Sequence, residues 1–271
     1  MPPERRSLDP GIALALSGGA ARCIAQIGVL EVLHEAGIPI HAVAATSAGA
    51  IVGALYASGR YATPEIVHLA RALRWRDIVK PRIPRMGLID SDKIHRYMKG
   101  LLGNSTFEDL TIPLAVTACD LKTGEKIILK EGSVARAVQA SCSLPVIFTP
   151  TRLENRLLVD GGIVSQLPIL AAKEASNGGF TVSVDVNHNA LDANGLNNMF
   201  QIAVHVVGLF ARRNANIERP YADIQINVDA ADVPLYALEK RELLLKRGRL
   251  AAKEKIAAIR EGLRGRATEP V

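Results

Sequence analysis

One serine in the sequence has the surroundings that a catalytic nucleophile needs. Ser47 stands at the centre of Ala-Thr-Ser-Ala-Gly (45–49), after the apolar run 42–45 and before the small-residue run 50–58. This pattern is typical of a nucleophile on a tight strand-to-helix turn, because bulky neighbours would block both the turn and the approach of a bound carbonyl. The segment alone also fits a serine that only caps an ordinary helix.

A carboxylate that could act as the base follows a second apolar run. Asp160 lies between the apolar residues 157–159 and the pair Gly161-Gly162, so its side chain leaves a strand end where no bulky neighbour stands. A serine hydroxyl attacks an ester poorly unless a base accepts its proton. We therefore expect Asp160 to meet Ser47 directly, although Asp-Gly-Gly also fits an ordinary turn.

A glycine-containing segment could supply hydrogen-bond donors for the oxyanion that forms in such an attack. In Ser-Gly-Gly-Ala-Ala-Arg (17–22), backbone amides and a cation stand at the start of a predicted helix, where negative charge is stabilised. The rival interpretation is a nucleotide phosphate site. This alternative is weak, because the P-loop lysine is missing and Ala20 and Cys23 occupy two glycine positions of the dinucleotide-binding fingerprint.

Histidine is the other residue type that could activate a serine. His188 follows the predicted strand 180–186 and comes after Ser47 and Asp160, which is the chain order of an α/β-hydrolase triad. A conventional Ser-Asp-His esterase that uses His188 is therefore the alternative mechanism. The remaining histidines mostly fit helix faces: His34, His41, His68, His95 and His205.

These segments belong to a regular alternation of predicted strands and helices. Strand 11–16, helix 22–36, strand 42–45 and helix 50–58 follow one another within the first part of the chain. Such alternation predicts an α/β fold with a doubly wound sheet and a site at the carboxyl ends of its strands. The further predicted strands are 112–119, 125–130, 156–159, 180–186 and 223–228, and the further helices are 63–74, 91–101, 133–140, 168–175, 198–212 and 235–261.

The length of 271 residues fits one domain that spans 1–271. Residues 60–105 are the best candidates for a cap or lid, and the stretch 81–87 within them is predicted to be irregular. Gly248 is a candidate interruption of the last helix, because glycine weakens a helix interior.

Composition excludes several other classes of protein. Hydrophobic residues make up 48% of the chain and charged residues 22%, and no apolar run is long enough to cross a membrane. The N-terminus lacks the apolar stretch of an export signal, and Cys23, Cys119 and Cys142 form no paired motif. We therefore expect a cytoplasmic protein without a disulfide framework or structural zinc.

The net charge of +6 would suit nucleic acid, an anionic membrane surface or an anionic substrate. Basic residues cluster around Trp75 and again over 240–266. Each cluster fits a solvated face, but cations beside an aromatic residue suit lipid head groups better than they suit the reading of bases. We therefore expect no nucleic acid partner and keep peripheral contact with an anionic membrane as the alternative to a solvated face.

Four segments together resemble the patatin-like lipid acyl hydrolases of bacterial type: 17–25, 45–49, 141–150 and 160–168. The most specific supporting match is Ala-Ser-Cys-Ser-Leu-Pro (140–145), which is similar to the serine-rich segment that precedes the aspartate strand in that family. The resemblance spans most of the chain, and its motifs lie within about 10–170. It implies a three-layer α/β sandwich with a mostly parallel central sheet.

The resemblance also implies a role for each candidate residue. It makes Ser47 the nucleophile and Asp160 its base, in a catalytic dyad that needs no histidine, metal or cofactor. The oxyanion hole would be formed by the glycine-rich loop and its cation: Gly18, Gly19, Ala20 and Arg22. The expected substrate is a fatty acyl ester of a phospholipid or another lipid, cleaved through an acyl-enzyme. No motif in the sequence selects a lipid class or an oligomeric state.

The chain departs from the family pattern at four positions. Ala20, Cys23 and Ala45 each replace a family glycine, and Gln166 stands where an asparagine is usual. Each methyl is expected to crowd a tight turn, although an alanine still supplies a backbone amide. We expect weakened or reshaped catalysis, with a non-catalytic, membrane-binding relative as the alternative.

Overall fold

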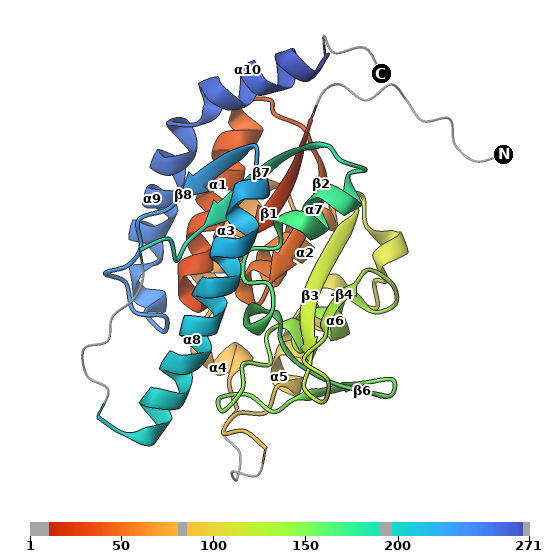
Figure 1. Cartoon of the computed structure of the whole chain (residues 1–271), viewed down its shortest axis with the longest axis vertical. Coiled ribbons are helices and arrows are strands. Elements are labelled where there is room, and N and C mark those ends of the chain that lie inside the picture. Colours follow the sequence, from red (N-terminus) through yellow and green to blue (C-terminus); the bar gives the residue numbers. More distant parts are fainter. Residues whose placement is uncertain (1–10, 81–85, 190–196, 268–271) are drawn as a thin grey trace, which may run out of the picture.

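The computed structural model describes residues 11–80, 86–189 and 197–267, which form an eight-stranded sheet between layers of helices (Figure 1). The strands are β1 (Ile12–Leu16), β2 (Ile40–Thr46), β3 (Leu114–Asp120), β4 (Lys126–Leu129), β5 (Thr151–Leu153), β6 (Arg156–Asp160), β7 (Phe180–Asp185) and β8 (Ile224–Asn227). The helices are α1 (Ile24–Glu35), α2 (Ala48–Ala57), α3 (Thr63–Ala72), α4 (Trp75–Ile78), α5 (Asp92–Leu102), α6 (Val134–Ser141), α7 (Ile169–Ala175), α8 (Met199–Glu218), α9 (Arg241–Lys253) and α10 (Ile256–Ala267). Of the stretch predicted to be irregular, residues 81–85 lie outside the described residues.

The sheet is parallel in one part and antiparallel in the other. Its strand order is β5-β6-β3-β2-β1-β7-β8, and β4 pairs with β3 beside this path. β3, β2, β1, β7 and β8 are parallel neighbours, whereas β4, β5 and β6 pair in the antiparallel sense. The predicted α/β sandwich with a mostly parallel sheet is confirmed.

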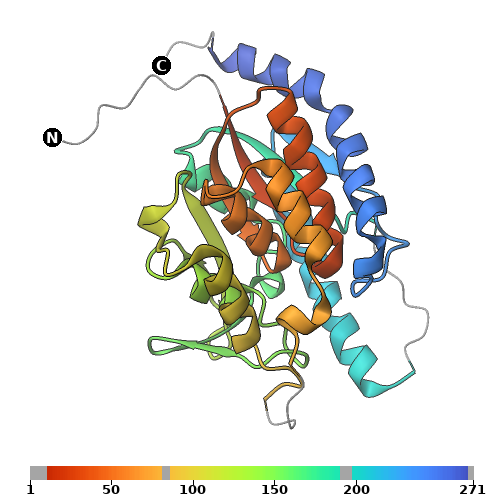
Figure 2. The same ribbon diagram turned by 180° about the vertical axis from the view of Figure 1, so that it is seen from behind.

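Alternation along β1 separates a face of large side chains from a face of small ones. Ile12, Leu14 and Leu16 join the core that contains α1 and α2, while Ala13 and Ala15 join a second core with α7. Figure 2 shows α1, α2 and α3 on the first side of the sheet, and Figure 1 shows α7 and α8 on the other. The small side chains leave room for α7 to lie close against β1 and β2.

Two glycines let α9 lie directly on α1. A Cβ added to Gly248 would lie 1.8 Å from the carbonyl oxygen of Ala25, and one added to Gly28 would lie 2.2 Å from that of Leu245. The suggestion that Gly248 interrupts the last helix was wrong, because Gly248 lies buried inside α9. The predicted long helix is instead divided between Lys253 and Ile256.

α8 is longer than its sequence pattern predicted. The apolar periodicity ends at Arg212, but the helix continues to Glu218 because Ala215 and Glu218 are buried against the body of the protein. Within the described parts of the chain, α8 included, no helix combines the length and apolarity that crossing a bilayer requires.

Candidate active site

Ser47 is the one residue that connects the end of β2 to the start of α2, and its backbone has a strained conformation. Its φ of 53° and ψ of −133° lie in a region that residues with a side chain rarely adopt. The turn is tight enough that a Cβ added to Gly49 would lie 2.4 Å from the carbonyl oxygen of Ser17. This conformation leaves the Ser47 side chain half-buried at the carboxyl end of the sheet rather than capping α2.

The register of β3 brings the end of β6 to the end of β2. Thr117 of β3 pairs with Thr46, and the next residue, Ala118, pairs with Asp160. Because β2 runs parallel to β3 and β6 runs antiparallel to it, both chains leave the sheet at this level. The hydroxyl of Ser47 donates a hydrogen bond of 2.6 Å to Oδ2 of Asp160.

Burial controls the acidity of Asp160. The side chain is 3% exposed, and desolvation raises its pKa to about 6, against smaller lowering effects of the hydrogen bonds from Ser47 and from the Gly162 amide. A carboxylate of this pKa is a stronger base than an exposed aspartate and is still mostly ionised at neutral pH.

The turn after Asp160 needs a residue without a side chain. A Cβ on Gly161 would lie 2.2 Å from the carbonyl oxygen of Thr117. The carboxylate therefore leaves the sheet over bare backbone, as the Asp-Gly-Gly pattern indicated.

Ser141 fixes the backbone of the candidate nucleophile. Its hydroxyl accepts a hydrogen bond of 2.7 Å from the Ser47 amide and donates one of 2.6 Å to the carbonyl of Thr117. The sequence identified the serine-rich segment around Ser141 only as an architectural match. A buried hydroxyl between two strand ends explains why a serine stands at this position.

The donor loop after β1 (17–22) lies beside Ser47, since a Cβ on Gly18 would lie 3.0 Å from Cβ of Ser47. Among the described residues, the amides of Gly19 and Ala20 have no acceptor, and both residues are accessible. Ala20 has a φ of 47°, so an alanine takes a strained conformation that glycine adopts freely.

Two of the expected donors have other partners. The Gly18 amide donates to the carbonyl of Gln166 at 3.1 Å. The buried guanidinium of Arg22 donates to the carbonyls of Val233 and Ala231. The hydrogen bonds of Gly18 and Arg22 thus hold the loop in place in this structure, and the part of these two residues in an oxyanion hole stays a prediction.

Asn187 was missed by the sequence analysis. It follows β7, and its Nδ2 donates a 2.7 Å hydrogen bond to the carbonyl of Gly18 while its Oδ1 accepts one of 3.0 Å from Arg22. Asp185 in turn accepts from the Asn187 amide at 2.8 Å. The signal that could have found it is an asparagine directly after a buried strand, on the edge where Ser47 and the donor loop lie.

Replacing Asn187 with alanine is expected to lower kcat by roughly tenfold to a hundredfold with little change in KM. The variant removes the side chain that donates to the Gly18 carbonyl and orients the Gly18–Gly19 peptide. The oxyanion donors are then misaligned, while the surface that binds the ester is unchanged. Steady-state kinetics with a short-chain ester measure the effect, and Asn189→Ala, two residues away and exposed, is the control. Equal kcat for both variants and the wild type would contradict this role for Asn187.

His188 does not join the pair. Asp160 accepts from Ser47 and from the Gly162 amide, and His188 bonds to neither partner, while its Nδ1 is buried without a hydrogen bond. Nothing in the arrangement of the described residues favours the alternative Ser-Asp-His triad.

Two of the four departures from the family pattern, Ala45 and Gln166, fit their surroundings. Gly53 of α2 presents bare backbone to Ala45, where an added Cβ would lie 3.2 Å from the Ala45 methyl. The side chain of Gln166 lies between two glycines, because Cβ atoms added to Gly18 and Gly162 would lie 2.8 and 2.5 Å from its Oε1. Ala45 and Gln166 are thus accommodated by glycines elsewhere.

The cysteines do not compete with Ser47. Cys23 and Cys142 are buried, and desolvation raises the pKa of both thiols well above the ordinary range. In the part of the chain that the structure describes, no three His, Cys, Asp or Glu side chains lie together as metal ligands would.

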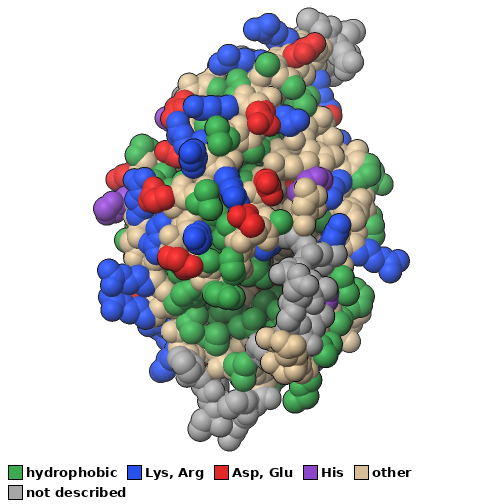
Figure 3. All heavy atoms as spheres, turned by 90° about the vertical axis from the view of Figure 1, so that its left-hand side faces the viewer, with side chains coloured by type: hydrophobic (Ala, Val, Ile, Leu, Met, Phe, Trp, Pro, Cys, Tyr) green, Lys and Arg blue, Asp and Glu red, His purple; other side chains and the backbone are tan. Residues whose placement is uncertain are grey.

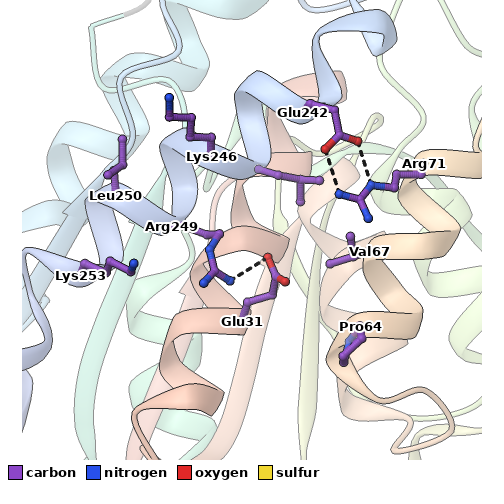
Figure 4. A pocket seen from close by; sticks show the side chains of 10 residues that line it. Glu31, Pro64, Val67, Arg71, Glu242, Lys246, Arg249, Leu250 and Lys253 are labelled. Atoms are coloured by element: carbon purple, nitrogen blue, oxygen red, sulfur yellow. Dashed lines mark hydrogen bonds and ion pairs between the residues drawn. The ribbon is translucent and has the colours of Figure 1, made fainter.

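A surface pocket of about 560 Å³ lies away from this pair, between α1, α3 and α9 (Figure 4). Four of its charged side chains form two ion pairs: Arg71 with Glu242 at 2.8 Å, and Arg249 with Glu31 at 3.3 Å. These pairs fasten α9 to α3 and to α1.

Comparisons with known proteins identify the family to which this chain belongs. A family model described as patatin-like phospholipase matches residues 14–173, more than half of the chain. An uncharacterized NTE family protein of Mycobacterium bovis is 36% identical over 186 residues, which cover 68% of this chain and 51% of that protein. Lysophospholipase NTE1 of Coccidioides immitis is 31% identical over 195 residues, or 70% of this chain and 12% of its own length.

The chain thus spans about half the length of the mycobacterial relative and a smaller share of the fungal one. The crystal structure of VipD from Legionella pneumophila superposes with a TM-score of 0.56, covering 93% of this chain and 67% of that chain. At 16% identity this similarity supports the fold alone. The extent of the family match, together with the relatives' identity, shows that the chain belongs to the patatin-like phospholipase family.

Proposed function

We propose that this protein is a serine lipid acyl hydrolase that works through a Ser47–Asp160 dyad. The observation that carries the proposal is the 2.6 Å hydrogen bond from the Ser47 hydroxyl to a buried carboxylate, beside two amides that have no acceptor among the residues described. Nucleophile, base and oxyanion donors are the three parts that acyl transfer needs. Membership of the patatin-like phospholipase family supports a lipid ester as the substrate.

In the first half of the reaction, Asp160 accepts the hydroxyl proton while Oγ of Ser47 bonds to the acyl carbonyl carbon. The carbonyl electron pair moves onto oxygen, where the amides of Gly19 and Ala20 donate to the resulting oxyanion. When the intermediate collapses, the alcohol leaves with the proton from Asp160. An acyl ester on Ser47 remains.

In the second half, Asp160 accepts a proton from water, and the water oxygen attacks the acyl-enzyme carbonyl. Collapse of this intermediate breaks the bond to Oγ of Ser47, which regains its proton from Asp160. A fatty acid is released, and the chain's own residues complete the cycle.

The class of substrate is proposed from the relatives and from the surface. The fungal relative is named a lysophospholipase. Figure 3 shows apolar side chains gathered around a hollow in the lower part of the face that carries α8. Such a surface suits fatty acyl chains, and we include contact with a lipid surface in the proposed function.

A fluorophosphonate probe tests the proposal, because it labels activated serines through the same attack. We expect labelling at Ser47, located by peptide mass spectrometry, and fatty acid release from at least one of phospholipid, lysophospholipid and neutral glyceride. Failure of both labelling and release would favour the non-catalytic alternative. Release that Asn187→Ala and Asn189→Ala leave untouched, without labelling of Ser47, would move the chemistry to another site.

A further inference from the structure

The N-terminal half of α8 presents an apolar face to solvent. Its exposed side chains, here called the outer face, are Met199, Ile202, Val206, Leu209 and Phe210, with exposed fractions from 41% to 88%. At roughly 100° per residue these five positions fall within one stripe about 100° wide. An ordinary surface helix has the opposite arrangement, with its apolar stripe toward the core.

The inner side of α8 is fastened to the candidate active site. Nδ2 of Asn214 donates to the carbonyl of Ile163, three residues after Asp160. Glu218 accepts hydrogen bonds from the hydroxyl of Ser165 and from the amide of Leu170. The carboxyl-terminal end of α8 is therefore held beside the turn that follows Asp160, and the rest of the helix extends away from it.

From Asn214 to Met199 the helix extends by roughly 22 Å, at 1.5 Å per residue. Figure 1 shows this half reaching past the body of the protein, below the sheet. The N-terminal half of α8 therefore lies toward the side where the parallel strands end. Figure 3 shows that the lower part of this side of the molecule is hollowed and apolar.

The charge of α8 is one-sided. Arg212 and Arg213 follow the outer face, no acidic residue occurs between Met199 and Ile217, and Glu218 is buried. Within the described residues, neither arginine has a carboxylate partner. The net charge of the chain is +6. A second copy of this chain would bring the same positive charges, whereas an anionic surface would complement them.

We propose that the outer face of α8 docks on an anionic lipid surface, with its apolar side chains in the acyl boundary and its arginines at the head groups. The inference rests on the proposed function, since a lipid hydrolase must reach esters packed in such a surface. Docking through α8 sets the Ser47 site against the surface that contains its substrate. It also moves the membrane contact away from the basic cluster at 240–266, in which Arg247, Arg249 and Arg266 pair with carboxylates.

Vesicle flotation tests the proposal without depending on turnover. All proteins carry Ser47→Ala, so that lipids are not consumed, and the vesicles contain phosphatidylcholine with or without phosphatidylglycerol. We expect binding to the vesicles that contain phosphatidylglycerol and weaker binding to phosphatidylcholine alone. Leu209→Glu should weaken the apparent affinity of the protein for the phosphatidylglycerol vesicles by about tenfold or more, because it removes an apolar contact and adds a negative charge.

The matched control is Leu250→Glu, which changes a leucine of similar exposure on α9. It should bind like the parent protein, and thermal unfolding checks that both variants fold. Equal binding of the two variants and the parent would overturn the proposal, as would a parent protein that binds no vesicle. A dimer in light scattering that Leu209→Glu converts to a monomer would assign the outer face to a second copy instead. If binding depends on α8 but the fluorophosphonate probe never labels Ser47 of the wild-type protein, the proposed function is overturned and the docking surface is not.

Discussion

Replacing Ser47 with alanine should reduce the release of fatty acid by a factor on the order of a thousand or more. The variant removes the attacking oxygen, and the neighbouring Ser141 hydroxyl is engaged as a donor to the carbonyl of Thr117. The donor loop and Asp160 remain, so any residual rate reflects binding and oxyanion stabilisation without covalent attack. Steady-state turnover of one lipid class by both proteins measures the loss.

Ser176→Ala is a suitable control for this experiment. Ser176 follows α7, and its hydroxyl donates to the carbonyl of Lys173 and accepts from the Gly179 amide, so its loss perturbs a helix end only. We expect wild-type turnover from this control. Wild-type turnover from Ser47→Ala would refute the assignment of the nucleophile.

Replacing Asp160 with asparagine should produce a loss of similar size. Asparagine has nearly the same shape and can still accept from the Gly162 amide, but it cannot take the proton of Ser47. Fluorophosphonate labelling of Ser47 should slow in parallel, because the hydroxyl is no longer activated. Labelling at the wild-type rate would show that another group serves as the base.

The pH dependence of the wild-type enzyme follows from the same group. With the pKa of Asp160 raised to about 6, the ionised, basic form is lost as the pH falls through that value. Below about pH 6, kcat/KM should fall roughly tenfold per pH unit, and above it the profile should level off. A value of kcat/KM that stays constant from about pH 4 to about pH 8 would contradict a role for Asp160 as base.

Asp160→Asn should also leave the protein at least as stable as the wild type at neutral pH. Burial raises the pKa of this carboxyl from 3.8 to about 6 in the folded state, so the folded protein binds the proton more tightly than the unfolded chain does. Wild-type stability from this group is therefore greatest at low pH and declines as the pH rises from about 4 to about 6, by up to roughly 3 kcal/mol. Urea unfolding at several pH values should show this decline in the wild type and not in the variant.

The sequence predicted the contact between Ser47 and Asp160 because local signals marked both residues. Each follows an apolar strand and precedes a turn built from residues with small side chains, and such turns leave a strong pattern. What the sequence could not provide was the β3 register, in which Thr117 and Ala118 take Thr46 and Asp160 as successive partners. That pairing joins segments more than a hundred residues apart.

Short elements and long-range hydrogen bonds were the features that sequence patterns missed. β5 and α4 have three and four residues, too few for a periodicity to appear. The partners of Arg22 were equally hidden, since a cation after a glycine-rich turn has the same local pattern whether it faces a ligand or backbone carbonyls. The carbonyls of Val233 and Ala231 that receive it come from the far end of the chain.

The support of the donor loop has a consequence for how this family can diverge. The family match ends at residue 173, yet Asn187, Val233 and Leu235 hold the loop through Gly18, Arg22 and Ala21. Under the proposed function, substitutions in a carboxyl-terminal region outside the family match can therefore change the catalytic rate and leave the reactive groups untouched. Homologues with identical motifs but different tails should then differ in speed, and exchanging tails between them would transfer that difference.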